Sequence, residues 1–599
     1  MNLLCFSLYF FNYEFNVIIG IFSLLHAATS TQSGIEIFAT KLSQFYRNSS
    51  KIVFQCRNEP LKYISLQIFD SKQHIKLQDK EQLPTQVEMN NNIKEFSSIE
   101  DQFITPALDE SPIQTFYKDK GVFLTGGTGF FGKIIIEKLL RITEVAQIYL
   151  LIRSKKGKDV YSRIEDLFND PVFEKLKKCN PKYRQKITII SGDCSLPALG
   201  ITQPERELIK ENVNIVIHGA ATVRFDEKLK MAIAINVNGT KEILQLAKEI
   251  VHLKAFVHVS TAFAHCNHRY IQERFYHSAI TGENACKLGE CLDEHTLNEL
   301  TATIIKGYPN TYTYTKVLAE DIVQNYAEKL PVTIFRPGIV ITTYKEPISG
   351  WIDNMYGPCG IIVGIGSGVL RVFSGKVDNK ANIVPVDLSV NALLASAWDI
   401  ARNTYDTPPI YNYVPDADNM VTWKEYMEYG FEYGCNIPMR KSIWYPRFTI
   451  VPWRWQFVIL SFLYHTVPAM FMDLSMIVVG KKPRMLKIYR KIHKFCSVME
   501  YFSSNDFKFD NDNVRTLSSK LEGADKQLFG FDMRHLDWKE LFRVSLVGLR
   551  LYVVKDDPRS VPESIKRHAR LKVLHYATLF IVYSLVLALL YKMTNFFFF

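Results

Sequence analysis

A glycine-rich stretch from Gly121 to Gly132, with the sequence GVFLTGGTGFFG, constrains the fold of this chain more than any other segment. It begins as a short apolar run typical of a buried strand, and the residues after it have the apolar spacing of a helix. Gly126, Gly129 and Gly132 recur at every third position, and Gly127 completes a G-x-G-x-x-G match. Such a strand–turn–helix unit binds a pyrophosphate with its backbone N–H groups. A tight turn whose glycines serve packing alone is the alternative.

Candidate strands alternate with helical patterns from Ser111 onwards, which is the pattern of a parallel sheet with helices on both faces. We therefore predict an α/β fold, with a Rossmann-type doubly wound parallel sheet in a domain of residues 111–445. The glycine turn forms its first crossover. The expected strands are residues 122–125, 148–152, 187–190, 215–217, 255–259 and 332–335.

Positive charge follows the second expected strand, where Arg153, Lys155 and Lys156 stand. NAD-binding folds usually place an acidic residue near this position to bind the ribose hydroxyls, whereas basic side chains suit the 2′-phosphate of NADP. The pattern favours NADPH over NADH, and an exposed basic loop is the alternative. Asp193 follows the third strand and is placed to accept a hydrogen bond from the adenine amine.

Tyr312 and Lys316 form the strongest signal for chemistry in the sequence. Residues four apart lie on one face of a helix, so the ammonium can lower the pKa of the phenol and also bind a ribose hydroxyl. Tyr314 is only two residues from the lysine and points to a different face. Ser260 and Thr261, at the end of the fifth strand, add hydroxyls that can bind a substrate oxygen. This order of residues predicts a catalytic site whose proton donor is Tyr312.

The order of glycine turn, Ser-Thr pair and Tyr-x-x-x-Lys resembles that of the extended short-chain dehydrogenase/reductases. Longer stretches resemble the fatty acyl-CoA reductases, especially the insect type, from about residue 111 to near the C-terminus. These stretches are residues 116–132, 218–227 (HGAATVRFDE), 236–240 (NVNGT), 308–316 (YPNTYTYTK) and 350–358 (GWIDNMYGP). Gly338 departs from the family pattern, which commonly has serine at this position.

The resemblance implies NADPH-dependent reduction of long-chain fatty acyl-CoA to a fatty alcohol, with release of CoA. The cofactor contacts that it implies are Gly126, Thr128, Gly129, Phe130, Gly132, Arg153, Asp193 and Lys316. The catalytic set that it implies is Tyr312, Lys316, Thr261 and Ser260. Two alternatives stay open: a membrane-bound sterol or steroid dehydrogenase of the extended short-chain type, and a nucleotide-binding membrane scaffold without enzymatic activity.

Other residues carry weaker patterns. Residues 347–368 are apolar and rich in glycine, so they can bend around a pantetheine arm or an acyl chain, and a surface loop is the alternative. Asp387 precedes a helix-like run and is expected to be its N-cap. Four histidines match no familiar ligand spacing, and we predict no metal site from them: His258, His265, His268 and His277.

The alternation of strands and helices stops near residue 446, and we predict a helical domain over residues 446–560, which the resemblance matches to the male-sterility type. Within it, residues 451–472 are apolar but contain charged residues and proline. These residues favour a helical hairpin, either on a membrane surface or buried in the protein, over a helix that spans the membrane. A basic segment follows at residues 481–494.

Residues 571–591 are apolar and long enough to cross a bilayer as a single helix. Lys566, Arg567, Arg570 and Lys572 lie at its start, so the positive-inside tendency places the catalytic part in the cytosol. We expect a membrane of the endoplasmic reticulum or the peroxisome, with membrane lipid as a partner. A hairpin lying in one leaflet is the alternative.

The composition indicates which classes of partner this chain can bind. The net charge of +11 is spread along the chain, so we predict no nucleic-acid partner. The hydrophobic fraction of 47% indicates lipid contact, and the 10 scattered cysteines indicate reduced thiols. Residues 1–110 have an apolar start with no Lys or Arg before Lys41, so an extension of uncertain order and a signal anchor both remain open. The oligomeric state is not predicted.

Overall fold

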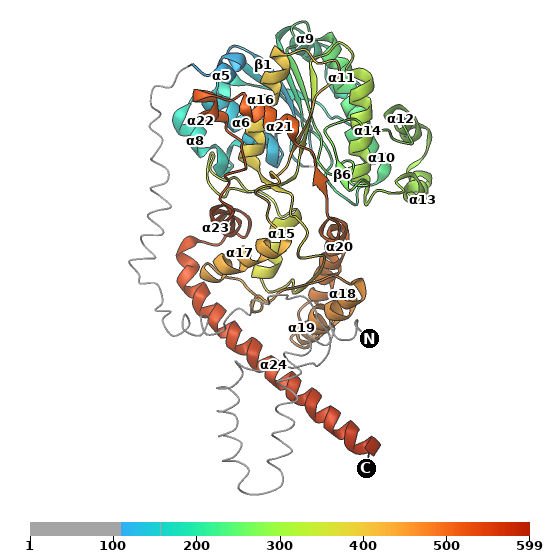
Figure 1. The fold of residues 1–599 in the computed structure, drawn as a ribbon, viewed down its shortest axis with the longest axis vertical. Coiled ribbons are helices and arrows are strands. Elements are labelled where there is room, and N and C mark those ends of the chain that lie inside the picture. The colour runs from blue at the N-terminus through green and yellow to red at the C-terminus, as the bar shows by residue number, and fades with distance from the viewer. Residues whose placement is uncertain (1–109, 156, 599) are drawn as a thin grey trace, which may run out of the picture. The chain divides into compact units, whose positions relative to one another are not determined.

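The computed structural model describes residues 110–155 and 157–598 of the chain (Figure 1). The predicted N-terminal extension, its possible targeting role and Lys156 lie outside the described residues. The described residues belong to one compact unit.

A central parallel sheet confirms the predicted doubly wound fold. Within the described residues it has seven strands in the order β11-β7-β5-β4-β1-β2-β3, and every neighbouring pair is parallel. The strands are β1 (Gly121–Thr125), β2 (Gln147–Ile152), β3 (Ile187–Ser191), β4 (Ile215–His218), β5 (Ala255–Val259), β7 (Val332–Pro337) and β11 (Ile410–Tyr413). The six predicted strands are present, and β11 was missed. Because the strand order reverses beside β1, a crevice for ligands opens at the carboxyl ends of β1 and β4.

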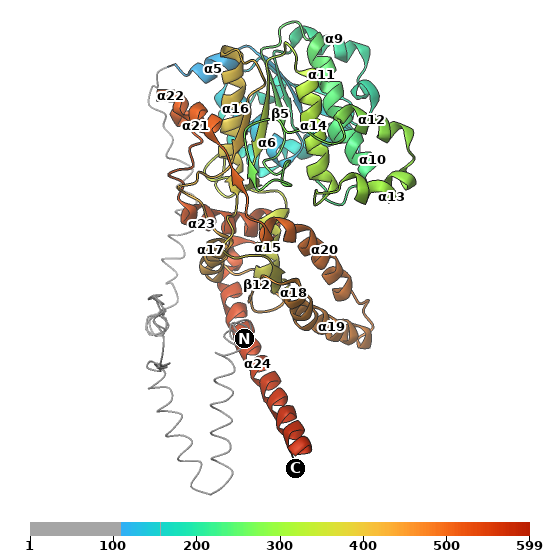
Figure 2. The same cartoon turned by 45° about the vertical axis from the view of Figure 1, so that its right-hand side comes forward.

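Helices cover both faces of the sheet, and the strands are accordingly mostly apolar. In β1, Val122 and Leu124 pack in one core cluster with α6 (Phe130–Ile142) and α16 (Val386–Arg402). Phe123, between them, packs in the other cluster with α11 (Gly239–Glu249) and α14 (Thr311–Tyr326). Figure 2 shows α16 on one side of the sheet and α11 and α14 on the other. This strict alternation fixes which face of each strand meets which helix layer.

The C-terminal third is mostly helical, and short strands connect it to the reductase part. It contains α18 (Arg454–Ser461), α19 (Val467–Val478), α20 (Met485–Ser504), α23 (Trp538–Gly548) and α24 (Val561–Phe598). Two pairings cross the predicted boundary at residue 446: β12 (Thr449–Val451) pairs with β9 (Val372–Ser374), and β13 (Lys508–Phe509) pairs with β6 (Tyr270–Ile271). That residues 446–560 form a separate helical domain therefore stays a prediction.

The remaining elements are mostly short. They are α5 (Pro112–Tyr117), α7 (Val160–Phe168), α8 (Glu174–Cys179), α9 (Gln203–Asn212), α10 (Leu229–Ala232), α12 (Gly282–Cys291), α13 (Glu294–Ile304), α15 (Gly357–Gly366), α17 (Trp423–Asn436), α21 (Asp512–Ser519), α22 (Gly523–Phe529), β8 (Ile339–Ile341) and β10 (Ile383–Pro385).

Two apolar helical segments are long enough to cross a membrane, counted over the described part of the chain. They are residues 454–478, where a π-helical turn joins α18 to α19, and residues 558–593 in the α24 region. Both are largely exposed, with Phe471 at 69% and Val478 at 82% in the first. The hairpin predicted within residues 451–472 is not present, because α18, the π-helical turn and α19 form one continuous helical segment. The chain turns back only after this segment, where α20 packs against α19, and the apolar side chains of the segment are largely exposed.

Asp387 is not the N-cap that the sequence suggested. The N-cap of α16 is Pro385, and Asp387 lies inside the first helical turn. Its buried carboxylate accepts hydrogen bonds from the backbone N–H groups of residues 344, 345 and 346, at 2.8, 2.8 and 3.0 Å. Burial raises the pKa of this carboxyl, and the three N–H groups act in the opposite direction. Asp387 therefore fixes the loop after β8 to the start of α16.

Glycine at position 548 permits α23 to pack directly on the loop after β8. A Cβ at residue 548 would lie 1.6 Å from the carbonyl oxygen of Gly350. We expect Gly548→Ala to lower the free energy of unfolding by about 1–3 kcal/mol, because the two backbones would have to separate. Urea denaturation of the detergent-solubilised chain, followed by tryptophan fluorescence, measures the change.

Gly434 in α17 is the matched control, because a Cβ there meets nothing within 4 Å. Gly434→Ala should be neutral or stabilise by up to about 1 kcal/mol through helix propensity. Equal stability of the two variants would show that the contact between residues 350 and 548 does not hold α23 in place.

Candidate active site

The glycine turn has the geometry of a phosphate-binding loop. Gly126 has φ of +78°, and a Cβ there would lie 2.7 Å from the carbonyl carbon of Gly219. A Cβ on Gly132 would lie 2.3 Å from the carbonyl oxygen of Gly126. Gly129 is the N-cap of α6 and supplies no side chain to its first N–H groups, which suit an anion. Phe130 is the first residue of α6, and its ring stacks on that of Trp351 with the centroids 5.3 Å apart.

Three basic side chains gather beyond β2, and one of them was missed in the sequence. Arg163 on α7 donates to the hydroxyl of Thr128 at 2.8 Å and to the backbone oxygen of Arg153 at 2.5 Å. Arg163 and Arg153, together with burial, lower the pKa of Lys155. Burial and Arg153 lower the pKa of Arg163. Mutual repulsion of this kind marks a place where a bound anion would be stabilised. The helical position of Arg163, ten residues beyond Arg153, carried no signal in the sequence.

Asp193 lies beside this basic cluster at the end of β3. Its carboxylate forms a 3.4 Å ion pair with Arg153 and accepts hydrogen bonds from the backbone and hydroxyl of Ser195, both at 2.9 Å. Asp193 therefore orients Arg153 in addition to lining the crevice. The structure thus brings Thr128, Arg153 and Asp193 together beside the glycine turn.

A buried polar chain connects β1 to the loop that follows β4. The hydroxyl of Thr125 lies 2.8 Å from Nδ1 of His218, whose Nε2 lies 3.1 Å from the hydroxyl of Thr240. Burial lowers the pKa of His218 to about 3, with Lys316 acting in the same direction, so this ring is neutral. Asn236, in a π-helical turn before α11, donates to the hydroxyl of Thr315 at 2.9 Å. These bonds hold α14 close to the glycine turn.

Tyr312, Lys316 and Thr261 converge at the carboxyl ends of β4 and β5. The ammonium of Lys316 donates to the backbone oxygen of Val259 at 2.7 Å. The hydroxyl of Thr261 interacts with the phenol of Tyr312 and accepts from the backbone N–H of Phe263 at 3.3 Å. Since the bond with Thr261 lowers the pKa of Tyr312, the Thr261 hydroxyl donates to the phenol oxygen, and it can rotate to donate to a substrate oxygen instead.

The pKa of Tyr312 is raised, whereas from the sequence we expected Lys316 to lower it. Burial raises the pKa of the Tyr312 phenol to about 12, and the bond with Thr261 acts in the opposite direction. The ammonium of Lys316 donates to the backbone oxygen of Val259. Burial lowers the pKa of Lys316 to about 8, against the opposing effect of Glu320. Tyr312 is thus protonated at neutral pH, as a proton donor must be.

Ser260 faces a different environment from Thr261. Its hydroxyl donates at 2.5 Å to Glu320, a buried carboxylate one helical turn beyond Lys316. Glu320 also binds the guanidinium of Arg336 through two hydrogen bonds of 2.9 and 2.5 Å, and His265 Nε2 at 2.8 Å. Burial acts to raise the pKa of Glu320, but Arg336 and His265 outweigh it and hold the pKa well below its usual range. The structure therefore separates the two hydroxyls, and only Thr261 meets Tyr312.

The four histidines singled out in the sequence, His258, His265, His268 and His277, do not share one site. His265 belongs to the Glu320 network, and His258 lies buried on β5 with its ring 5.5 Å from that of His218. Among the described residues, no group of three or more His, Cys, Asp or Glu side chains is arranged to hold a metal ion.

The C-terminal helical part reaches the active site through α20. The ring of Phe225, in the loop after β4, lies 5.8 Å from that of Tyr312 and 5.8 Å from that of Phe502 on α20. Beside it, Lys494 of α20 forms a 2.7 Å ion pair with Asp226. No pattern in the sequence indicated the contacts with α20, which join residues more than 250 positions apart.

Comparison with known proteins agrees with this geometry. Two family models, both described as male sterility protein, match residues 124–393 and 464–556, and the first is an NAD-binding model. The NAD-binding match and the glycine turn together indicate a nicotinamide cofactor. Among solved structures, a terminal reductase domain of the myxalamid biosynthetic pathway aligns with 76% of this chain and 97% of its own, at 18% identity and a TM-score of 0.48.

Two curated relatives carry the assignment to a family. The chain is 75% identical over 509 residues to the fatty acyl-CoA reductase wat of Drosophila melanogaster, covering 85% of this chain and 98% of that protein. It is 36% identical over 468 residues to fatty acyl-CoA reductase 1 of Rattus norvegicus, covering 78% and 90%. Because both matches span nearly the whole of each relative, this chain belongs to the fatty acyl-CoA reductase family.

Proposed function

We propose that this chain reduces long-chain fatty acyl-CoA to the fatty alcohol, with NADPH as reductant and release of CoA. The observation that carries the proposal is the convergence of Tyr312, Thr261 and Lys316 beside the glycine turn. The family assignment supports the same substrate class.

In the first reduction, Thr261 donates a hydrogen bond to the thioester carbonyl oxygen, and Tyr312 transfers its phenolic proton to that oxygen. The bound reduced nicotinamide supplies a hydride to the carbonyl carbon. The resulting hemithioacetal breaks its C–S bond, and the proton on oxygen moves to the departing sulfur. The products are an aldehyde and CoA thiol.

In the second reduction the aldehyde carbonyl occupies the same place. Once Tyr312 has regained a proton from water, Thr261 binds the aldehyde oxygen and Tyr312 protonates it, and a second hydride from a bound reduced nicotinamide would give the alcohol. Each alcohol therefore requires two reduced nicotinamides and two protons. Lys316 stays fixed through Val259, where it positions the strand end that carries Thr261 and offers its remaining N–H groups to a ribose hydroxyl.

NADPH as the specific reductant is supported by the basic cluster. Arg163, Arg153 and Lys155 lie next to Thr128, at the end of β2 where the adenosine ribose binds in folds of this class. A 2′-phosphate bound among them would relieve their mutual repulsion, whereas a free 2′-hydroxyl carries no charge to do so.

The proposed membrane arrangement has α24 as a span and the catalytic part in the cytosol. Lys566, Arg567 and Arg570 near the start of α24 line a surface hollow together with Arg440 and Lys441, a charge pattern that suits anionic headgroups. The exposed apolar side chains of α19, followed by the basic residues 481–494, form a second surface that suits the same bilayer.

Tyr312→Phe should abolish the reaction while leaving the cofactor site intact. We expect acyl-CoA-dependent NADPH oxidation to fall about 10²–10⁴-fold, the usual contribution of a positioned proton donor. NADPH binding, measured by fluorescence titration, should be largely unchanged. Tyr314→Phe is the matched control, because Tyr314 is buried and its ring contacts Tyr308. Unchanged turnover of Tyr312→Phe would contradict the proposed role.

Arg163→Ala should weaken NADPH selectively. A charge-assisted hydrogen bond contributes about 1.5–3 kcal/mol, so we expect the KM for NADPH to rise roughly 10- to 100-fold, with little change for NADH. Steady-state kinetics with both cofactors measure the ratio. Arg206→Ala, which removes an arginine paired with Glu249, is the control. An equal loss for both cofactors would mean that the cluster does not bind a 2′-phosphate.

Removal of residues 571–599 should show whether α24 and the surface formed by α19 and residues 481–494 contact the membrane independently. We expect the full chain to resist alkaline carbonate extraction from membranes, and the truncated chain to be released. The truncated chain should still sediment with anionic vesicles, because α19 and the basic segment remain, and Phe471→Asp with Val478→Asp should prevent this. Carbonate resistance of the truncated chain would contradict the role of α24 as the span.

A further inference from the structure

Basic side chains gather in a surface hollow between the loop after α17 and the start of α24, and we call it the α24 hollow. Its volume is about 550 Å³, which falls within the roughly 300–1,000 Å³ of small-molecule sites. Five cations and one carboxylate line it: Arg440, Lys441, Lys566, Arg567, Arg570 and Glu563. Its size and its charge together indicate a site for an anion.

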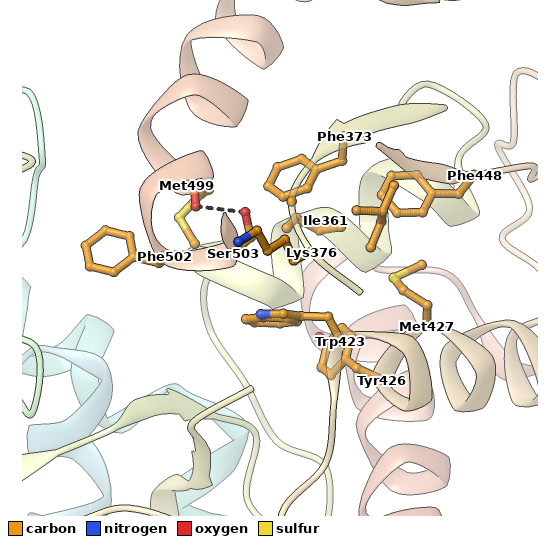
Figure 3. Close-up of a pocket in the computed structure, with 12 residues that line it drawn as sticks. Ile361, Phe373, Lys376, Trp423, Tyr426, Met427, Phe448, Met499, Phe502 and Ser503 are labelled. Atoms are coloured by element: carbon orange, nitrogen blue, oxygen red, sulfur yellow. Dashed lines mark hydrogen bonds between the residues drawn. The ribbon is translucent and has the colours of Figure 1, made fainter. Parts of the chain in front are cut away.

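The helix α17, which leads into this hollow, is held by close packing. Figure 3 shows side chains of α15, α17 and α20 that meet around an apolar space, among them Ile361, Met427 and Met499. The volume left between them is about 20 Å³, enough for a single water molecule. These side chains therefore pack against one another, and the loop after α17 leaves from a fixed point.

Hydrogen bonds hold the two walls of the α24 hollow together. The buried guanidinium of Arg550 donates to the backbone oxygen of Pro438 and, at 2.8 Å, to the hydroxyl of Ser560 directly before α24. Arg567 on α24 donates to the backbone oxygen of Ser442 at 3.0 and 3.1 Å. The loop thus keeps its place beside α24 without a ligand, which lowers the entropic cost of binding one.

The positive charges of the hollow are only partly compensated. Arg440 forms a 3.3 Å ion pair with Glu563, and both side chains are more than half exposed. Lys441, Lys566 and Arg570 have no carboxylate within ion-pair distance in the part of the chain that the structure describes. Like charges around one hollow repel one another, so a bound anion would be stabilised there.

The hollow lies at the level of lipid head groups when α24 spans the bilayer. Residues 571–591 are apolar and extend for roughly 31 Å as a helix, which matches a hydrocarbon core of about 30 Å. Arg567 and Arg570 precede this stretch by no more than about 6 Å along the helix axis. The polar layer on each side of the core is roughly 5–8 Å thick, so both guanidinium groups start from within it.

The charge of the hollow favours one kind of head group. A phosphate diester carries a single negative charge, whereas a phosphate monoester carries about −1.5 to −2 and offers three acceptor oxygens. Arginine binds such a group with two parallel hydrogen bonds from its planar fork. A zwitterionic head group brings its own ammonium and would leave the repulsion among the five cations in place.

We propose that the α24 hollow binds one anionic phospholipid whose head group carries a phosphate monoester, as phosphatidic acid does. This inference rests on the proposed span by α24, because only then do the acyl chains of the lipid lie beside residues 571–591. A bound head group joins the loop of residues 440–442 to α24 and so fixes the catalytic part at the membrane surface. Clusters of roughly four to eight basic residues beside a membrane helix are typical of anionic-lipid binding.

Native mass spectrometry of the full chain in dodecyl maltoside measures this binding. We expect one dioctanoyl phosphatidic acid to bind at least about 10-fold more tightly than dioctanoyl phosphatidylcholine. Lys441→Ala with Lys566→Ala should weaken binding of the phosphatidic acid about 10- to 30-fold, because two cations are lost. Lys178→Ala with Lys182→Ala removes the same charge from exposed positions at α8 and should have no effect. Equal affinity for the two lipids, or an equal loss in both double variants, overturns the inference.

Glu563→Gln tests the hollow through a gain of binding, which misfolding cannot produce. Removal of the carboxylate releases Arg440 and should tighten binding of dioctanoyl phosphatidic acid about 3- to 10-fold. Glu144→Gln is the matched control, because Glu144 is also exposed and forms a 3.0 Å ion pair with Lys118. Unchanged or weaker binding by Glu563→Gln contradicts the proposed site.

Free CoA is the competing occupant, because it also carries a phosphate monoester. It should not displace the phosphatidic acid, and displacement by CoA would overturn the lipid assignment. Carbonate extraction of the full chain separates this inference from the proposed span. A chain that carbonate releases but that binds phosphatidic acid refutes the span and leaves the binding of the head group standing. A chain that resists carbonate but does not distinguish the two lipids refutes the α24 hollow as a lipid site alone.

Discussion

The buried carboxylate of Glu320 is the interaction on which the geometry of the site depends. It joins three elements of the sheet region, because it binds Ser260 at the end of β5, His265 in the following turn and Arg336 at the end of β7. Glu320 lies one helical turn beyond Lys316, so these bonds fix the position of α14 along the strand ends. A buried carboxylate is stable only with such partners, and removing one partner typically costs roughly 3–5 kcal/mol. The placement of Tyr312 is therefore set by a network that does not touch the substrate.

The shape of the cofactor-binding glycine turn depends on a second constraint, which is the close approach of its backbone to that of neighbouring segments. The positive φ of Gly126 and the crowding around Gly132 bring β1, α6 and the loop after β4 within van der Waals distance. That compactness places the N-terminus of α6 beside Thr128 and the arginines of β2 and α7. Anion-binding N–H groups and positive side chains thus face one place, which suits a dinucleotide with an additional phosphate.

The helical C-terminal part contacts the active-site loop and also carries exposed apolar helices. One end of α20 contacts the active-site loop through Phe225 and Asp226, and the helix packs at its other end against the exposed apolar helix α19. The same helical part therefore contacts the active-site loop and presents an exposed apolar surface.

Reading the residues alone was enough to predict the fold class, the family and six strands of the sheet. Glycine spacing and the Tyr312–Lys316 interval are local patterns, and local backbone geometry is what a sequence encodes directly. These patterns could not distinguish Ser260 from Thr261, since adjacent strand residues point to opposite faces and only the position of Glu320 decides which one meets Tyr312. Arg163 and Phe225 acquire their places through tertiary packing, because each contacts elements distant in the chain that packing alone brings together.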